Sequence, residues 1–303
     1  MEVNWAPLLG KCQISDGELI FKGGLIEVAG QQVCAGGKFI TDSEFAGGTI
    51  TTEFEFAEID QYTTCEIILY HNPASDYMLT AGLGGAGLYN IREFQNQWFL
   101  HGTVGDRSNL QRHKKYWMKV SLSGSRVTLT VDEVDVLSRN LPFQLTLGQV
   151  GLWCASLSYI TVTDFDVRGE ATKAFVVMQF STLYNELYDD VIIPVCEDYR
   201  IKAIRVDEVC GPGLIIADII TQIIESQLII AEITPENPNV YYEIGYAHAL
   251  GKPTILIAEE NTQLPFDLSP FRVLFYENSI SGKKRIEEGL RKNLSAIVER
   301  SVS

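Results

Sequence analysis

Residues 237–253 read NPNVYYEIGYAHALGKP, a stretch that places one acidic residue, Glu243, among small and apolar neighbours. Two asparagines and a proline at its start, and Gly251 with Pro253 at its end, predict a helix with Glu243 in or next to the first turn. There the helix dipole favours a charged carboxylate by roughly 0.3–1 kcal/mol. Glu243 is therefore a candidate nucleophile or ribose ligand that stays ionised at neutral pH. The plainer alternative is an acid that only complements the helix dipole.

Strands and helices alternate on both sides of this helix. Apolar runs predict strands over residues 174–178, 202–206, 228–231, 254–258 and 273–276, and helical spacing predicts helices over 184–199, 213–226 and from about 282 to 300. The alternation predicts an α/β domain over residues 174–303, with a doubly wound parallel sheet of flavodoxin-like strand order. Ligands of such sheets bind beyond the carboxyl ends of the strands.

Up to about residue 168 the hydrophobic period is two instead. Ile50, Phe54 and Phe56 alternate with polar residues, and segments 118–122 and 127–131 do so on either side of a Ser-Gly-Ser turn. This pattern predicts an antiparallel β-sandwich over residues 1–168, so we expect a two-domain α+β chain. The order of the signals resembles a concanavalin A or laminin G-like jelly-roll sandwich. That resemblance implies a sensing or assembly module, or a module that binds a glycan or a protein.

Three residues of the sandwich segment, Tyr89, Trp98 and His101, fall in a predicted loop region. Exposed aromatic residues of this kind occur in sugar-binding sandwiches, but packing explains them more simply. The segment lacks the compact Asp/Asn cluster that binds calcium. In the second half, His248 lies five residues after Glu243, off its helix face, and is expected to be structural.

Charge and composition exclude several classes of function. The formal net charge is −15, and both halves are acidic, with 12 Lys/Arg against 20 Asp/Glu in residues 1–170 and 12 against 19 in residues 171–303. Such a balance argues against sequence-independent nucleic-acid binding. The sequence has no apolar run of the roughly 20 residues that a membrane helix needs and no secretory signal, so we expect a cytoplasmic location. Its six scattered cysteines predict free thiols and no metal site.

Polar residues follow the predicted strands of the second half. They are Gln179, Phe180 and Ser181 after the first strand, Asp207 and Glu208 after the second, Glu232 after the third, and Asn237, Asn239 and Glu243 just beyond. We expect the four carboxylates among them to converge on one edge of the sheet, where they could bind the paired hydroxyls of a ribose. Residues 174–303 contain neither a GxGxxG nor a Walker loop, which argues against a Rossmann dehydrogenase and a P-loop nucleotidase.

Several short motifs together carry a resemblance. FVVMQF (175–180), RVDE (205–208), GLI (213–215), SQLIIAEIT (226–234), NPNVYYEIG (237–245) and PFDL (265–268) resemble the nucleoside 2-deoxyribosyltransferase-like superfamily over residues 174–276. This superfamily is related in fold to TIR domains. Both groups include enzymes that break the N-glycosidic bond of nucleosides, nucleotides or NAD, and several members act in antiphage defence.

The resemblance implies roles for individual residues. Glu243 would be the nucleophile that attacks the anomeric carbon, Met178, Gln179 and Phe180 would line the base pocket, and Asp207 and Glu232 would lie near the ribose or the base, while Asn239 would orient the substrate. The chain departs from the family pattern at Gln179, where proline is usual, and at Glu232, where aspartate is usual. Asn237 and Asn239 occupy the region where the transferases carry an aspartate.

Three functions are compatible with these patterns. The first is an N-glycosidic hydrolase or transferase that acts on NAD, a nucleoside or a nucleotide and needs no cofactor or metal. Nicotinamide leaves NAD as an already cationic base, so one carboxylate can suffice. The second is a catalytically silent nucleotide-binding domain of a signalling protein, and the third is a binding sandwich with a regulatory α/β domain. In the transferases a neighbouring subunit completes the site, which implies a homo-oligomer.

Overall fold

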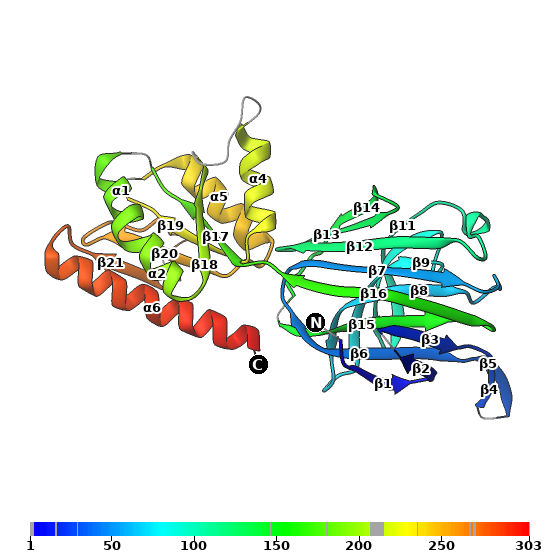
Figure 1. Cartoon of the computed structure of the whole chain (residues 1–303). Coiled ribbons are helices and arrows are strands. Elements are labelled where there is room, and N and C mark those ends of the chain that lie inside the picture. Colours follow the sequence, from blue (N-terminus) through cyan, green and yellow to red (C-terminus); the bar gives the residue numbers. More distant parts are fainter. Residues whose placement is uncertain are drawn as a thin grey trace. The chain divides into compact units, whose positions relative to one another are not determined.

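A computed structural model of the chain describes residues 3–15, 17–28, 30–145, 147–179, 181–206, 215–234, 236–266, 268 and 271–302. The chain forms two compact units. The first comprises residues 1–122, 126–141 and 147–170, and the second comprises residues 171–303 together with the short segments 123–125 and 142–146. Figure 1 shows the strands of the first unit and the mixed helices and strands of the second.

The N-terminal unit contains two seven-stranded antiparallel sheets. In spatial order, the first sheet consists of β1 (Trp5–Leu9), β6 (Gly36–Phe45), β15 (Gly148–Ala155), β8 (Thr64–Asn72), β9 (Tyr77–Leu83), β10 (Tyr89–Gln95) and β11 (Gln97–Val104). The second consists of β14 (Val134–Asn140), β13 (Arg126–Val131), β12 (Lys115–Ser123), β7 (Gly48–Phe56), β16 (Tyr159–Gly169), β3 (Glu18–Lys22) and β2 (Lys11–Ser15). A separate hairpin joins β4 (Leu25–Val28) to β5 (Gln31–Cys34), and residues Arg107–Asn109 form a short 3₁₀ turn, η1.

The period-two pattern of the sequence is the direct cause of this sandwich. Along β7, buried and half-buried residues alternate from end to end, with Ile50, Phe54 and Phe56 almost fully buried. The neighbouring strand β12 alternates in the same way. Because successive side chains point to opposite faces of a strand, each sheet turns one apolar face toward the other. The predicted sandwich is confirmed.

The three residues that we expected in a loop lie in strands instead. Tyr89 begins β10, whereas Trp98 and His101 belong to β11, and the two strands are joined by a tight turn at Asn96, whose φ is 64°. Asparagine tolerates this left-handed conformation, so the hairpin needs no longer loop. Trp98 packs against Phe94 at 5.3 Å between ring centroids. The packing interpretation of Trp98 is therefore confirmed, and the loop assignment is wrong.

The C-terminal unit contains one five-stranded parallel sheet. Its spatial order is β18 (Ile201–Arg205), β17 (Thr172–Val177), β19 (Leu228–Glu232), β20 (Thr254–Glu259) and β21 (Val273–Tyr276), which is the flavodoxin-like order 2-1-3-4-5 that the sequence predicts. The helices are α1 (Thr182–Leu187), α2 (Ile193–Asp198), α4 (Ile215–Glu225), α5 (Pro238–Ala249) and α6 (Ile280–Val302).

Both faces of the parallel sheet are covered. Ala174 and Val176 of β17 contribute to a core with α2 and α6, whereas Phe175 and Val177 contribute to a second core with α4 and α5. A strand that is buried on both sides needs continuous apolar sequence, which is why residues 174–177 of β17 and 228–231 of β19 are unbroken hydrophobic runs. In Figure 1, α4 and α5 are seen beside β17.

The first helical segment differs from the single helix predicted over residues 184–199. A π-helical turn, η2 (Tyr188–Ile192), separates α1 from α2. Pro194 lies in the first turn of α2 and has no N–H to donate to the carbonyl one turn earlier. The wider turn accommodates this missing bond without interrupting the helical path.

A buried lysine closes the C-terminal end of α4. The Nζ atom of Lys252 donates to the carbonyl oxygens of Ile224 at 2.8 Å and Ser226 at 2.7 Å. Burial lowers the pKa of Lys252 to about 8. We expect Lys252→Met to lower the free energy of unfolding of this unit by about 1–3 kcal/mol, because the carbonyl of Ser226 loses the Nζ donor and the carbonyl of Ile224, which also accepts from the backbone N–H of Ser125, loses one of its donors. Urea denaturation measures the change, with Lys202→Met at an exposed position of β18 as the control. Equal stability of the two variants would contradict this role.

The five cysteines within the described residues are free, as predicted. Cys65, Cys154 and Cys196 are buried, Cys12 and Cys34 are half-buried, and Cys210 lies outside the described residues. Among the helices in the described ranges, none is long and apolar enough to cross a membrane.

Candidate active site

A cavity of about 780 Å³ opens where β17 ends, between α4 and the first turns of α5. Its lining consists of residues 175–179, Val206, Ile216, Ile219, Asn237, Asn239, Val240, Tyr242 and Glu243. Because β17 lies between β18 and β19, the strand order reverses there, and such a switch point is where open α/β sheets bind ligands. The cavity thus lies where the sequence predicts a binding site. Its volume falls within the range of about 300–1,000 Å³ that is usual for small-molecule sites.

Local sequence explains how α5 carries its acid into this cavity. Asn237 is the N-cap residue, with extended backbone angles, and its Oδ1 atom accepts from the backbone N–H of Asn239 at 3.0 Å. Pro238 occupies the first helical position, where its missing N–H costs nothing. Val240, Ile244 and Ala247 face the core and orient the helix. This orientation leaves the side chain of Glu243 on the cavity wall.

Glu243 lies next to the first turn of the helix, as the sequence predicts. Counted from Pro238, it is the sixth helical residue and belongs to the second turn, and the first turn contains no acidic residue. The helix dipole acts mainly within the first turn, so it contributes little to the charge state of this carboxyl.

Burial, and not the dipole, controls the titration of Glu243. Desolvation raises its pKa to about 7, and within the described part of the chain the carboxyl has no hydrogen-bond or ion-pair partner. Burial favours the neutral form of a carboxyl unless a charge or donor compensates. Burial therefore opposes the ionised state that the sequence analysis expects for Glu243 at neutral pH. A pKa this close to neutrality suits a reacting group.

Amide and apolar groups complete the described wall of the cavity. Met178 and Gln179 directly follow β17, and Asn239 projects from the first turn of α5. Asn237 uses its Oδ1 atom as the helix cap, which leaves the Nδ2 group for a ligand. The structure thus brings together Met178, Gln179, Asn237, Asn239 and Glu243 from the predicted set.

Two predicted residues do not line this cavity. Ser181 is the exposed N-cap of α1, and its side chain makes no capping bond. Glu232 is only 1% exposed and bonds to Thr234 and Tyr276 inside the protein. Its longer side chain, compared with the usual aspartate, reaches Tyr276 at the end of β21. The predicted role of Glu232 as a ribose ligand is therefore a wrong assignment in this structure.

The remaining predicted residues, Phe180, Asp207 and Glu208, lie outside the described residues. Of the four carboxylates expected to converge on the edge of the sheet, Glu243 is the one that lines the cavity among the described residues, and Glu232 does not join it.

Sequence reasoning missed several residues of the wall. Tyr242 is 51% exposed and adjoins Glu243, and Ile216 of α4 is 51% exposed as well. The helical spacing of the isoleucines in α4 predicts the helix but does not tell which of them face a cavity. A signal existed, because apolar residues cover too much of that helix surface for one buried stripe. By contrast, His248 behaves as predicted, since its ring stacks on Phe271 with 4.4 Å between centroids.

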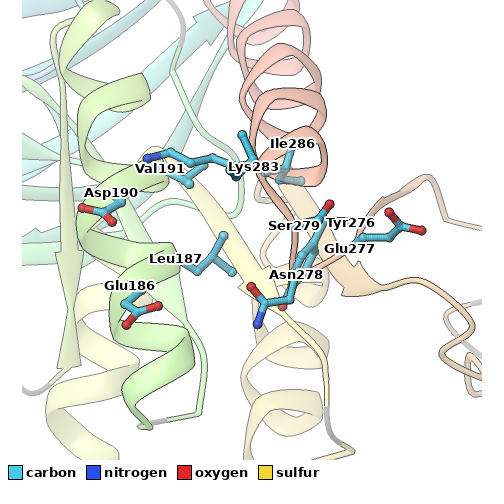
Figure 2. Close-up of a pocket in the computed structure, with 11 residues that line it drawn as sticks. Glu186, Leu187, Asp190, Val191, Tyr276, Glu277, Asn278, Ser279, Lys283 and Ile286 are labelled. Carbon is cyan, nitrogen blue, oxygen red and sulfur yellow. The ribbon is translucent and has the colours of Figure 1, made fainter.

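A smaller cavity of about 210 Å³ lies near the start of α6, on the face of the sheet opposite α5. Figure 2 shows Glu186 and Asp190 on one helical segment, and Lys283 with Ile286 on α6. The three charged side chains are exposed. This cavity contains none of the predicted site residues.

Comparisons with known proteins give partial similarity in fold. A scan of protein-family models and a search of curated proteins found no match. Among solved structures, the carbohydrate-binding module CBM66 from Bacillus subtilis is 11% identical with a TM-score of 0.45, and the match covers 53% of this chain and 92% of that chain. The β-glucanase of Bacillus licheniformis is 11% identical with a TM-score of 0.36, covering 55% and 93%. A CMP N-glycosidase from Clostridium botulinum is 20% identical with a TM-score of 0.33, covering 39% and 97%.

Proposed function

We propose that the α/β unit cleaves the N-glycosidic bond of NAD, a nucleoside or a nucleotide, as a hydrolase or transferase, with Glu243 as the nucleophile. One observation carries the proposal: a half-buried carboxyl without a described partner faces a cavity of about 780 Å³ at the switch point of the sheet. A purely structural acid would be exposed or paired, because burial of an uncompensated carboxyl costs free energy.

The chemistry follows from this arrangement. As the bond between the anomeric carbon and the base nitrogen breaks, the electron pair leaves with the base and the sugar becomes oxocarbenium-like. A carboxylate oxygen of Glu243 then forms a bond to the anomeric carbon. Water, in a hydrolase, or a second base, in a transferase, then attacks the anomeric carbon and breaks its bond to Glu243, which restores the free carboxylate; an attacking water releases its proton to the solvent. The capture of the sugar is the step that needs Glu243 in its ionised form.

The wall of the cavity supports a sugar with an attached base. Apolar side chains such as Val206 and Ile219 provide surface for a base, and the amides of Gln179 and Asn239 can bond base edges or sugar hydroxyls. Glu243 is the one carboxyl among the described lining residues. A base that departs without protonation, such as the nicotinamide of NAD, suits such a site.

The test is chromatography of the purified chain after incubation with NAD, NADP and a panel of ribo- and deoxyribonucleosides and nucleotides. Free nicotinamide or nucleobase is the expected product. Release that persists unchanged in Glu243→Gln would contradict the assignment. Substrate binding in a thermal-shift screen without any release would instead favour a catalytically silent nucleotide-binding domain.

The pH dependence of the reaction gives a second prediction. Because the ionised form of Glu243 reacts and its pKa is raised to about 7, the rate should increase as pH rises through 7. An unperturbed glutamate, with a pKa of about 4.3, would give a flat profile from about pH 6 upwards. The pH profile of kcat/KM with the best substrate of the panel distinguishes these outcomes. A midpoint below pH 5 would contradict the burial that we assign to Glu243.

We further propose that the chain acts as a homo-oligomer in the cytoplasm, with the sandwich of residues 1–168 as a sensing or assembly module for a glycan or protein and residues 174–303 as the effector. A role in antiphage defence through NAD or nucleotide depletion agrees with this division. Sedimentation of the active protein tests the first part, and a monomer that retains full activity would contradict it. The second part is tested by measuring cellular NAD during phage infection in cells that express the wild type or Glu243→Gln.

A further inference from the structure

Glu232 is a buried acid that the proposed reaction does not use. It ends β19, is 1% exposed and does not line the large cavity. Its Oε2 atom accepts from the backbone N–H of Thr234 at 3.0 Å, and its Oε1 atom accepts from the hydroxyl of Tyr276 at 3.3 Å. The carboxyl therefore links the end of β19 to the end of β21 and to the chain that leaves β19.

Thr234 is fixed from a second direction as well. Its Oγ1 atom accepts from the backbone N–H of Glu259 at 3.0 Å and lies 3.2 Å from the hydroxyl of Thr262. Three residues further along the chain, Asn237 caps α5, which carries Glu243 into the cavity. The bonds at Thr234 thus hold this residue to the ends of β19 and β20.

We propose that Glu232 is a positioning residue for Glu243: by bonding Thr234 and Tyr276, its carboxyl fixes the start of α5 relative to the sheet and so holds the nucleophile in place. This inference rests on the proposed function, because it takes Glu243 as the nucleophile. Glu232 does not touch the cavity, so it acts only through the helix.

Filling space in the core does not explain why position 232 carries an acid. Burial raises its pKa to about 8, the bonds from Thr234 and Tyr276 oppose this increase, and the nearby Glu259 adds to it. The other titratable groups that face Glu232 are Tyr184 of α1 and Tyr241 of α5. A hydrophobic residue would fill this space without a desolvation cost. A carboxyl at this position accepts from both the backbone N–H of Thr234 and the hydroxyl of Tyr276, which a hydrophobic side chain cannot do.

Hydrogen exchange of α5 tests the positioning role without any substrate. In Glu232→Ala, we expect the backbone amides of Asn239 and Tyr241, which bond to Asn237, to exchange about tenfold faster or more, because the approach to the helix loosens. Glu232→Gln keeps an acceptor for Thr234 and should exchange nearly as the wild type does. Glu236→Gln, an exposed charge change in the same loop, is the matched control. Wild-type exchange in Glu232→Ala would overturn the proposal. If that variant fails to fold, Tyr276→Phe, which removes one of the two bonds, takes its place with a smaller increase expected.

Kinetics with the best substrate of the panel separate positioning from a purely structural role. A displaced nucleophile should lower kcat by about 100-fold in Glu232→Ala with little change in KM, since a shift of about 1 Å costs that much. Glu232→Gln should restore most of kcat. Equal losses in the two variants, or a change confined to KM, would overturn the proposal. If the wild type releases no base from any substrate, the proposed function fails, and the exchange measurement still decides whether Glu232 positions α5.

A pH series of unfolding identifies the buried carboxyl directly. The pKa of Glu232 is raised in the folded state, so its contribution to stability is full below the unfolded value near 4.5 and is lost as pH rises through about 8. Glu232→Gln should remove that loss and melt higher than the wild type at pH 9, with little difference at pH 5.

Discussion

Glu243→Gln should lower the rate of base release by about 10³-fold or more, because an amide oxygen cannot capture the oxocarbenium-like sugar as a carboxylate does. The substitution keeps the shape of the side chain, so the cavity and its amide groups should still bind the substrate. We therefore expect the loss in kcat, with KM changed much less. Initial rates of base release for the wild type and the variant measure this effect.

The same variant should be more stable than the wild type in alkaline buffer. The pKa of Glu243 is raised to about 7, so the stability that its neutral form provides is present below pH 4.5 and is lost as pH rises through 7. Glutamine stays neutral throughout, and its melting temperature should exceed that of the wild type at pH 8 but not at pH 4.5. Lost activity with higher stability is typical of a residue that is kept for function. Lost activity with lower stability at pH 8 would indicate that Glu243 supports the fold instead.

The sequence was informative about the fold for a simple physical reason. Strand and helix periods come from the backbone, and burial on one face or both leaves a clear mark, as in the alternation along β7 and the unbroken apolar run of β17. Local departures from regular backbone structure were harder to predict from the sequence. The π turn before Pro194 and the tight turn at Asn96 depend on single residues, whose effect on neighbouring backbone is not periodic.

The candidate site was only partly predictable. The rule that ligands bind beyond strand ends brought Gln179, Asn239 and Glu243 to one cavity. The same rule failed for Glu232, because it gives the edge of the sheet but not the face toward which a side chain turns. Whether an acid at that edge faces the cavity or the interior depends on a partner distant in sequence, here Tyr276, 44 residues away. Pairings of that kind appear only in the folded structure.

The largest stability effect is expected in the sandwich, for Arg92→Met. Glu66 of β8 is 0% exposed, and both of its carboxylate oxygens lie close to Nε of Arg92, at 2.9 and 3.0 Å. The guanidinium of Arg92 also lies 3.7 Å from the ring centroid of Trp98. Removing the arginine leaves a buried carboxylate without its counter-charge, which costs about 3–5 kcal/mol. Urea denaturation of the wild type and the variant measures the decrease in the free energy of unfolding.

Two further variants show whether the isolated charge, rather than lost packing, causes this decrease. In Glu66→Met with Arg92→Met both charges are absent, so most of the stability should return, because methionines of similar length fill the space without a desolvation cost. Arg112→Met removes the exposed partner of Glu58, where the side chains are 65% and 57% exposed, and should cost no more than about 1 kcal/mol. If the double variant is as unstable as Arg92→Met alone, the contact with Trp98 would be the stabilising interaction, and the ion pair would contribute little.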